Sequence, residues 1–326
     1  MYLRSLKIHK FRNFQETRLD VHPARNFIFG DNAQGKTNLI EAIYLLCFTK
    51  SFRTKEDFEC IPFTGSEYYI EGDFTRKTNL SHHIGIRYNR QEGKQIKLDG
   101  SRVNQFSRFI GQFPIVILTV DDYTITDGPP FYRRRYFNIL LSQSSTRYLD
   151  DLKHYDRVLA QRNLILNEIA EGKKKNSDQL EAWSTQLVQR GARIMQARWT
   201  MVKDMNTILQ NNYTQVSGQS EPLRIAYTPN VFCNSPESAE QCLESKLAEI
   251  TPKEKRRGTS LAGPHRDEFI FYIGSRELRR FGSRGEHKSV LVSLKAAESR
   301  FLNDAAGTPP IILLDDLYAE LDTERA

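Results

Sequence analysis

Apolar and polar residues alternate along the first hundred residues in a way that is typical of strands. The alternation runs over residues 2–9 and again over 16–21, which predicts two strands joined by a bend. The same period of two returns over residues 68–74, 83–88 and 95–98. Because such alternation gives each strand one buried and one polar face, we expect a mostly antiparallel sheet here.

The middle of the chain has helical spacing instead. Two apolar stripes of helical period occupy residues 148–213, and a polar segment at 171–177 separates them. This pattern predicts a long helical hairpin. Further helices are expected over residues 235–250 and 288–303.

Two continuous aliphatic runs, residues 113–119 and 310–314, have the form of strands buried on both faces. The second run ends in Asp315 and Asp316. A shorter apolar run at 26–29 also predicts a strand end. Strands and helices together predict an α/β fold.

The run at 26–29 leads into a phosphate-loop pattern, Gly-x-x-x-x-Gly-Lys-Thr, at residues 30–37, and helical spacing follows. In this context, backbone N–H groups and a helix N-terminus would surround an anion. Lys36 would reach the β- and γ-phosphates, and the hydroxyl of Thr37 would hold Mg²⁺. The loop is the strongest chemical signal in the sequence.

Composition and charge narrow the possible functions of the protein only slightly. The 326 residues carry a net charge of +7 and a pI near 9.1, which is compatible with a polyanionic partner such as nucleic acid. The four cysteines form no CxxC pair and are interpreted as free thiols of a reducing cytosol. No signal peptide or membrane-span pattern is found, so we expect a soluble cytoplasmic protein without a membrane partner.

A second group of candidate nucleotide-site residues lies near the end of the sequence. Ser283, Arg284 and Gly285 stand where a helix begins, so they could present a hydroxyl and N–H groups to a γ-phosphate or form an ordinary N-cap. Asp315 would hold Mg²⁺ through a bound water, and Asp316 would polarise the attacking water. His265, in a loop, could be a catalytic base or a structural hydrogen-bonding residue.

The order of phosphate loop, large insertion, Ser-x-Gly helix and acidic strand resembles ABC-type ATPases, in particular their SMC-like branch. The resemblance implies an ATPase head with an antiparallel β layer and an inserted helical-hairpin lobe. It also implies that Ser283, Arg284 and Gly285 complete the site of a second subunit, so that ATP joins two copies in a homodimer.

A narrower set of segments resembles the RecF family of bacterial recombination mediators: residues 11–14, 32–44, 50–54, 133–137, 263–267 and 314–322. The resemblance implies that Arg12 joins the loop in binding ATP, the loop residues being Gly30, Asp31, Asn32, Ala33, Gln34, Gly35, Lys36, Thr37 and Asn38. It further implies a dimer on duplex DNA and single-strand/double-strand junctions. With RecR and RecO, this dimer would help load RecA in recombinational repair, replication-fork maintenance and the SOS response.

The resemblance implies three parts: residues 1–147 and 216–326 as two portions of the ATPase lobe, and 148–215 as a helical arm. It also implies that the last portion lacks the family's final segment. Because an aspartate at 316 reaches less far than a glutamate, we expect weak DNA-stimulated hydrolysis at most. Two alternatives are a nucleotide-gated structural clamp with little hydrolysis and, less favoured, the ATPase subunit of a transporter.

Overall fold

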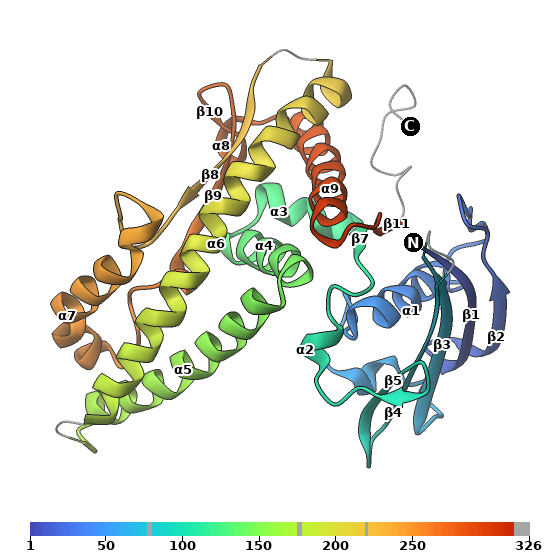
Figure 1. Ribbon diagram of the computed structural model, residues 1–326, viewed down its shortest axis with the longest axis horizontal. Coiled ribbons are helices and arrows are strands. Elements are labelled where there is room, and N and C mark those ends of the chain that lie inside the picture. The colour runs from blue at the N-terminus through green and yellow to red at the C-terminus, as the bar shows by residue number, and fades with distance from the viewer. Residues whose placement is uncertain (77–79, 175–177, 219–220, 316–326) are drawn as a thin grey trace. The chain divides into compact units, whose positions relative to one another are not determined.

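The part of the chain that the computed structural model describes consists of four segments, residues 1–76, 80–174, 178–218 and 221–315 (Figure 1). Its contacts divide the chain into two compact units, which are described separately. The first comprises Met1–Val120 and the chain from Glu298 onward, and the second comprises Asp121–Ala297. The three-part division predicted at residues 147 and 215 stays a prediction.

The first unit contains a six-stranded sheet with strand order β2-β1-β3-β4-β5-β6. Its strands are β1 (Tyr2–Phe11), β2 (Phe14–Asp20), β3 (Glu67–Thr75), β4 (Ser81–Asn89), β5 (Gly93–Leu98) and β6 (Ser101–Arg102). All neighbouring strands are antiparallel, which confirms the sheet predicted from the period of two. Paired positions place Ile8, Ile70, Ile86 and Ile96 side by side across four strands, and all four are fully buried.

Helix α1 (Lys36–Phe48) packs against this sheet, with contacts to β1, β3 and β4 (Figure 1). All residues from Leu39 to Cys47 are buried. A helix that is apolar on every side belongs in a core, as this one does. The one acidic residue among them, Glu41, must therefore find partners inside the protein.

Strands β7 (Ile115–Leu118) and β11 (Ile311–Leu314) form a parallel pair in the first unit. The register pairs Leu118 with Leu314, and the backbone N–H of Asp315 donates to the carbonyl of Leu118 at 2.9 Å. This pairing fixes where the chain delivers Asp315. A short helix, α2 (Phe106–Phe109), precedes β7.

The expectation of full burial is wrong for β11. Leu313 is buried, but the side chains of Ile312 and Leu314 are 54% and 49% exposed. Because successive side chains of a strand point to opposite faces, only the Leu313 face packs against the core of the described residues.

The strand predicted at residues 26–29 is also absent. Residues 22–35, all of which the structure describes, form no strand, and Phe29 is 86% exposed. The rings of Phe27 and Phe29 stack on each other with centroids 6.2 Å apart. An apolar run becomes a strand only when a neighbouring strand pairs with it, and sequence pattern does not report that partner.

The second unit is built mainly of helices. They are α3 (Tyr123–Asp127), α4 (Pro130–Ser144), α5 (Thr146–Ala170), α6 (Asp178–Ser217), α7 (Ala239–Arg257), α8 (Leu278–Phe281) and α9 (Arg284–Ala306), the last of which continues past Glu298. Helices α5 and α6 lie side by side as the predicted hairpin (Figure 1). Strands β8 (Leu223–Thr228), β9 (Glu268–Ile273) and β10 (Arg276–Glu277) form an antiparallel sheet with order β10-β9-β8. Among the described residues, no helix is both long and apolar enough to cross a bilayer.

Candidate nucleotide-binding site

The phosphate loop turns through three residues with positive φ: Gly30 at 155°, Ala33 at 65° and Gly35 at 105°. Gly35 is the N-cap of α1. A Cβ at Gly35 would lie 2.7 Å from both amide atoms of Asn13, and a residue carrying it would have to adopt a φ of 105°, so this position favours glycine. The loop therefore ends at a helix N-terminus, where backbone N–H groups and the helix dipole favour an anion.

The Lys36 side chain folds back over this loop. Its Nζ donates hydrogen bonds to the carbonyls of Gly30 at 2.8 Å and Asp31 at 2.9 Å. The ammonium is thus held against the loop that would receive a phosphate. This position agrees with the role predicted for Lys36, which stays a prediction.

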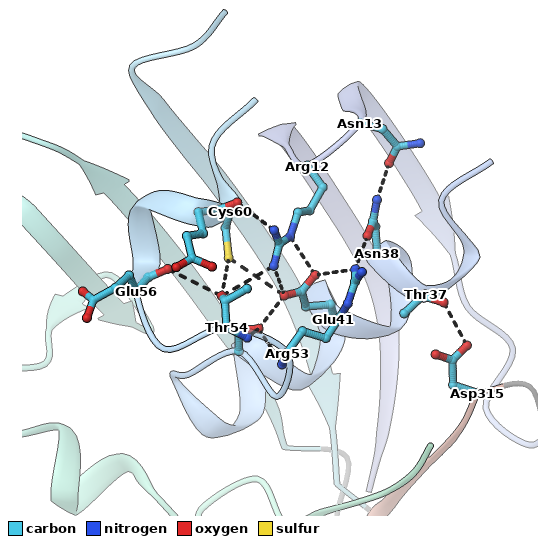
Figure 2. A network of polar contacts seen from close by, with 12 residues as sticks. Arg12, Asn13, Thr37, Asn38, Glu41, Arg53, Thr54, Glu56, Cys60 and Asp315 are labelled. Carbon is cyan, nitrogen blue, oxygen red and sulfur yellow. Dashed lines mark hydrogen bonds and ion pairs between the residues drawn. The ribbon is translucent and has the colours of Figure 1, made fainter. Parts of the chain in front are cut away.

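Thr37 and Asp315 lie together although 278 positions separate them in the chain. The Thr37 hydroxyl donates to Asp315 Oδ1 at 3.1 Å (Figure 2). A hydroxyl and a carboxylate are hard oxygen ligands of the kind Mg²⁺ prefers, so these two residues fit the predicted metal. Asp316 lies outside the described residues, and its role in polarising water stays a prediction.

Three side chains form a series of hydrogen bonds that leads to the loop: Asn38, which was predicted to bind ATP, and Asn13 and Arg53, which were not among the predicted site residues. Asn13 Nδ2 donates to the Gln34 carbonyl at 3.1 Å, and Asn38 Nδ2 donates to Asn13 Oδ1 at 2.8 Å. Arg53 in turn donates to Asn38 Oδ1 at 2.7 Å (Figure 2). The bend after β1, the start of α1 and the segment after α1 therefore meet at the phosphate loop.

Glu41 is the buried acceptor beneath this chain of bonds. Its side chain is 0% exposed and accepts two bonds from the Arg12 guanidinium, 2.9 Å from Nε and 2.6 Å from one terminal nitrogen. Burial alone would lower the pKa of Arg12, but the hydrogen bonds and charge of Glu41 raise it above its ordinary value. Arg53 also lies 3.5 Å from the Glu41 carboxylate. The predicted contact of Arg12 with ATP stays a prediction, since its guanidinium is engaged here with Glu41.

Ser283 stands at the start of α9 in the second unit. Its backbone N–H donates to Glu286 Oε2 at 2.7 Å, and its hydroxyl accepts from the Glu286 N–H at 3.2 Å. This reciprocal pair is a capping box, so the N-cap function is present. The hydrogen bond from the Ser283 backbone also lowers the pKa of Glu286. The roles of Ser283, Arg284 and Gly285 in a second subunit's site stay predictions.

Known proteins are similar to this chain over its whole length. The RecF/RecN/SMC N terminal domain matches residues 2–326. The chain is 34% identical over 333 residues to the DNA replication and repair protein RecF of Staphylococcus epidermidis, covering 100% of this chain and 88% of the relative. It is also 34% identical over 330 residues to the protein of that name from Chloroherpeton thalassium, covering 100% and 89%. This chain belongs to the RecF family.

Solved structures agree with membership of the RecF family. A structure of the recombination mediator protein RecF–ATP in the RecFOR pathway is similar with a TM-score of 0.93 and 29% identity, over 99% of this chain and 87% of that chain. A Pyrococcus furiosus Smc head domain is similar with a TM-score of 0.50 at 12% identity, which concerns the fold alone. The predicted ABC/SMC-like ATPase fold is thereby confirmed.

Residues 263–267, one of the segments that carried the RecF-family resemblance, form a turn in the core of the second unit. Asp267 is 0% exposed and accepts hydrogen bonds from Arg198 at 2.8 Å, from the Asn230 N–H at 2.8 Å and from the Tyr227 hydroxyl. Because these donors come from α6 and from the chain around β8, the turn connects those two parts of the unit.

His265, in the same turn, is bound to a buried tyrosine. Its Nδ1 and the Tyr155 hydroxyl form a hydrogen bond of 2.6 Å. Burial, reinforced by the nearby positive charges of Arg266 and Arg134, lowers the pKa of His265 to about 4. A histidine held neutral in this way favours the structural interpretation over a catalytic base.

The depressed pKa predicts how stability depends on pH. Since the unfolded chain protonates His265 below about pH 6.5 while the folded chain resists until about pH 4, the folded state loses stability as the pH falls between these values. The loss is about 3 kcal/mol at most. Urea unfolding of the wild type and of His265→Gln at several pH values measures it. A difference between the two proteins that is constant from pH 6.5 to 4 contradicts the assignment.

The predicted site residues do not include Asn13, Glu41 and Arg53, although two of these three carry a signal in the sequence. Glu41 is a lone acid in an otherwise apolar helical segment, a pattern that indicates a buried ion pair. Asn13 lies in a short bend between Phe11 and Phe14, where a polar side chain often bonds to nearby backbone. Nothing in the sequence says that the bend lies beside the phosphate loop.

Proposed function

We propose that the chain is an ATP-dependent DNA-binding protein of recombinational repair and replication-fork maintenance that acts in the cytoplasm. The observation that carries the proposal is the hydrogen bond between Thr37 and Asp315. It joins the phosphate loop to the acidic strand end, the pair of elements that phosphoryl-binding sites use to hold a nucleotide and its metal. Relatives named as DNA replication and repair protein RecF, and similar structures named RecF–ATP, support it.

In this proposal the loop binds the ATP phosphates through its backbone N–H groups, and Lys36 binds the β- and γ-phosphates. Thr37 and Asp315 hold Mg²⁺, which when bound neutralises phosphate charge. Asn38 and Arg12 complete the contacts, and Asp316 orients the attacking water. The remaining contacts are those of the loop itself: Gly30, Asp31, Asn32, Ala33, Gln34 and Gly35.

We further propose that two copies bind two ATP molecules between them. The Ser283 hydroxyl and the N-terminus of α9 would complete the partner's site, with Arg284 and Gly285 beside them. A serine hydroxyl that accepts a bond, as Ser283 does from the Glu286 N–H, can still donate its hydrogen to a phosphate oxygen. ATP would then serve mainly to stabilise a dimer of this chain on DNA.

The proposed substrate is DNA with single-strand/double-strand junctions. RecR, RecO and RecA are the partners this function implies, and the SOS response is the process it would support. The similar structures are of RecF in the RecFOR pathway, which supports this choice of partners.

The Glu286 carboxylate favours the variant of this proposal in which hydrolysis is weak. It accepts the Ser283 N–H at 2.7 Å and pairs with Arg276 at 3.1 Å. The carboxylate engages the Ser283 N–H, so one donor that could stabilise the transition state of hydrolysis is already bonded within the chain. A nucleotide-gated clamp with little, DNA-stimulated turnover is therefore the second candidate.

DNA titrations test the proposal. On gapped DNA, ATP should tighten binding by about 10-fold or more, and fully duplex DNA should respond less. The affinity should fall steeply as salt rises, because a basic protein releases counterions from the phosphates it contacts. Light scattering on the same samples should show the mass double with ATP. Equal affinity for both DNAs with and without ATP, or a flat salt response, would reject the proposal.

A further inference from the structure

The side chain of Asn13 connects the bend between β1 and β2 to the phosphate loop. Its Nδ2 donates to the Gln34 carbonyl at 3.1 Å. Its amide also lies so close to Gly35 that a Cβ there would stand 2.7 Å from both Nδ2 and Oδ1. Asn13 therefore packs directly against the Gln34–Gly35 peptide and restricts how it can turn.

The orientation of that peptide decides where its N–H points. The chain has no cis peptide bonds among its described residues, so carbonyl and N–H point to opposite sides of each peptide. Because the Gln34 carbonyl faces Asn13, the Gly35 N–H faces away from Asn13. An N–H at the N-cap of a helix is one of the groups that bind an anion.

Asn38 and Arg53 fix which way round the Asn13 amide lies. Asn38 Nδ2 donates to Asn13 Oδ1 at 2.8 Å, so the Asn13 Nδ2 is left facing Gln34. Arg53 donates to Asn38 Oδ1 at 2.7 Å and orients that amide in the same way. The bonds run in one direction, from Arg53 through two amides to the loop carbonyl, and Figure 2 shows the first two of them.

Glu41 lies beside Arg53, at the end of this series of hydrogen bonds that is away from the loop. Its buried carboxylate lies 3.5 Å from Arg53 and is bound by Arg12, which is the residue before Asn13. Ser51 donates to the same carboxylate, and the Ser51 hydroxyl accepts the backbone N–H of Arg53 at 3.0 Å. One carboxylate in α1 thus anchors both segments that supply the side chains of the series.

We propose that Asn13 is a positioning residue, which with Asn38 fixes the Gln34–Gly35 peptide so that the loop is shaped for a phosphate before nucleotide binds. The inference rests on the proposed function in that the anion is taken to be a nucleotide phosphate. Asn13 acts through the loop backbone and makes no contact with ATP itself.

The test compares Asn13→Ala with Asn89→Ala in the full chain. Asn89 is a matched control, because its Oδ1 also accepts backbone N–H groups, those of Gln91 and Glu92 in the turn between β4 and β5. Loss of the bonds at Asn13 should weaken ATP binding by about 5- to 30-fold, and Asn89→Ala should leave it unchanged. Titration with a fluorescent ATP analogue measures the affinity.

Hydrogen exchange without nucleotide provides the second readout. The Leu39 N–H, the first of α1 to find a helical partner, bonds to the Gly35 carbonyl at 2.9 Å, so its exchange reports the order of the loop's end. It should exchange several-fold faster in Asn13→Ala and at the wild-type rate in Asn89→Ala. Weaker ATP binding with unchanged exchange would mean that Asn13 contacts nucleotide directly and would overturn the inference, as would unchanged affinity. If the wild type binds no ATP, the proposed function fails, and the exchange rates still decide the role of Asn13.

Two further variants separate positioning from general loss of structure. Asn13→Asp keeps the acceptor for Asn38 but replaces the donor to Gln34 with a carboxylate oxygen, so it should bind ATP no better than Asn13→Ala. Because Asn13 and Asn38 share one hydrogen bond, the double alanine variant should lose less affinity than the product of the single losses. The positioning role of Asn13 would be overturned if Asn13→Asp bound ATP as tightly as the wild type. It would also be overturned if the loss of ATP affinity in the double variant equalled the product of the two single losses.

Discussion

Lys36→Met should weaken ATP binding by about 100-fold, because it removes the ammonium that in the proposed function binds the β- and γ-phosphates. Methionine keeps the aliphatic length of lysine without its ammonium. The bonds it removes, to the carbonyls of Gly30 and Asp31, lie at the exposed surface of the loop, so folding should be nearly unaffected. ATP-dependent mass doubling and retention on gapped DNA should be lost with the affinity.

The control for this variant is Lys97→Met, a change at an exposed lysine of β5 in the same unit. It should bind ATP like the wild type. If Lys36→Met forms the ATP-dependent dimer and retains DNA as well as Lys97→Met does, the phosphate loop is not the nucleotide site. Isothermal titration with ATP and light scattering, run on the same preparations, give both answers.

Asp267→Ala should destabilise the folded protein by about 3–5 kcal/mol, the usual cost of leaving one charge of a buried ion pair without its partner. The Arg198 guanidinium would keep its bonds to the Pro264 carbonyl and to Asn138 but would lose the only carboxylate it contacts among the described residues. The Tyr227 hydroxyl and the Asn230 N–H would lose their acceptor as well. Urea or thermal unfolding measures the change in the free energy of unfolding.

Glu221→Ala is the matched control for Asp267→Ala. It also removes a carboxylate from an arginine in the second unit, but both side chains of the Arg276–Glu221 pair are about half exposed. An exposed pair contributes at most about 1 kcal/mol. Equal destabilisation in the two variants would show that the turn at 263–267 does not organise the core of its unit.

The parts of the candidate site that are contiguous in the chain could be predicted from sequence. The loop at 30–37 can be recognised from its motif of two glycines, a lysine and a threonine at fixed spacing. These residue types allow the loop to surround a phosphate. Asp315 could be predicted because an aliphatic run ends in acids. The hydrogen bond between Thr37 and Asp315 shows that the phosphate loop and the end of the acidic strand meet in the folded chain.

The residues that shape the loop could not be predicted in this way. Asn13, Glu41 and Arg53 come from three different segments, and the local signals at Asn13 and Glu41 do not point to the phosphate loop. They act together only because β1 and the segment after α1 both reach Glu41. Sequence spacing carries no information about such a meeting, because it depends on how α1 packs on the sheet.

The sequence by itself determined the elements whose pattern is local: the antiparallel strands, the helical hairpin, the loop and its helix. Tertiary structure alone decided which faces are covered, so residues 26–29 form no strand and β11 is exposed on one side despite their apolar sequences. It also decided that Arg12 faces Glu41, which lies 29 positions further along the chain. The physical reason is that periodicity reflects the water and neighbours of one element, whereas burial and polar pairing depend on residues far away in the chain.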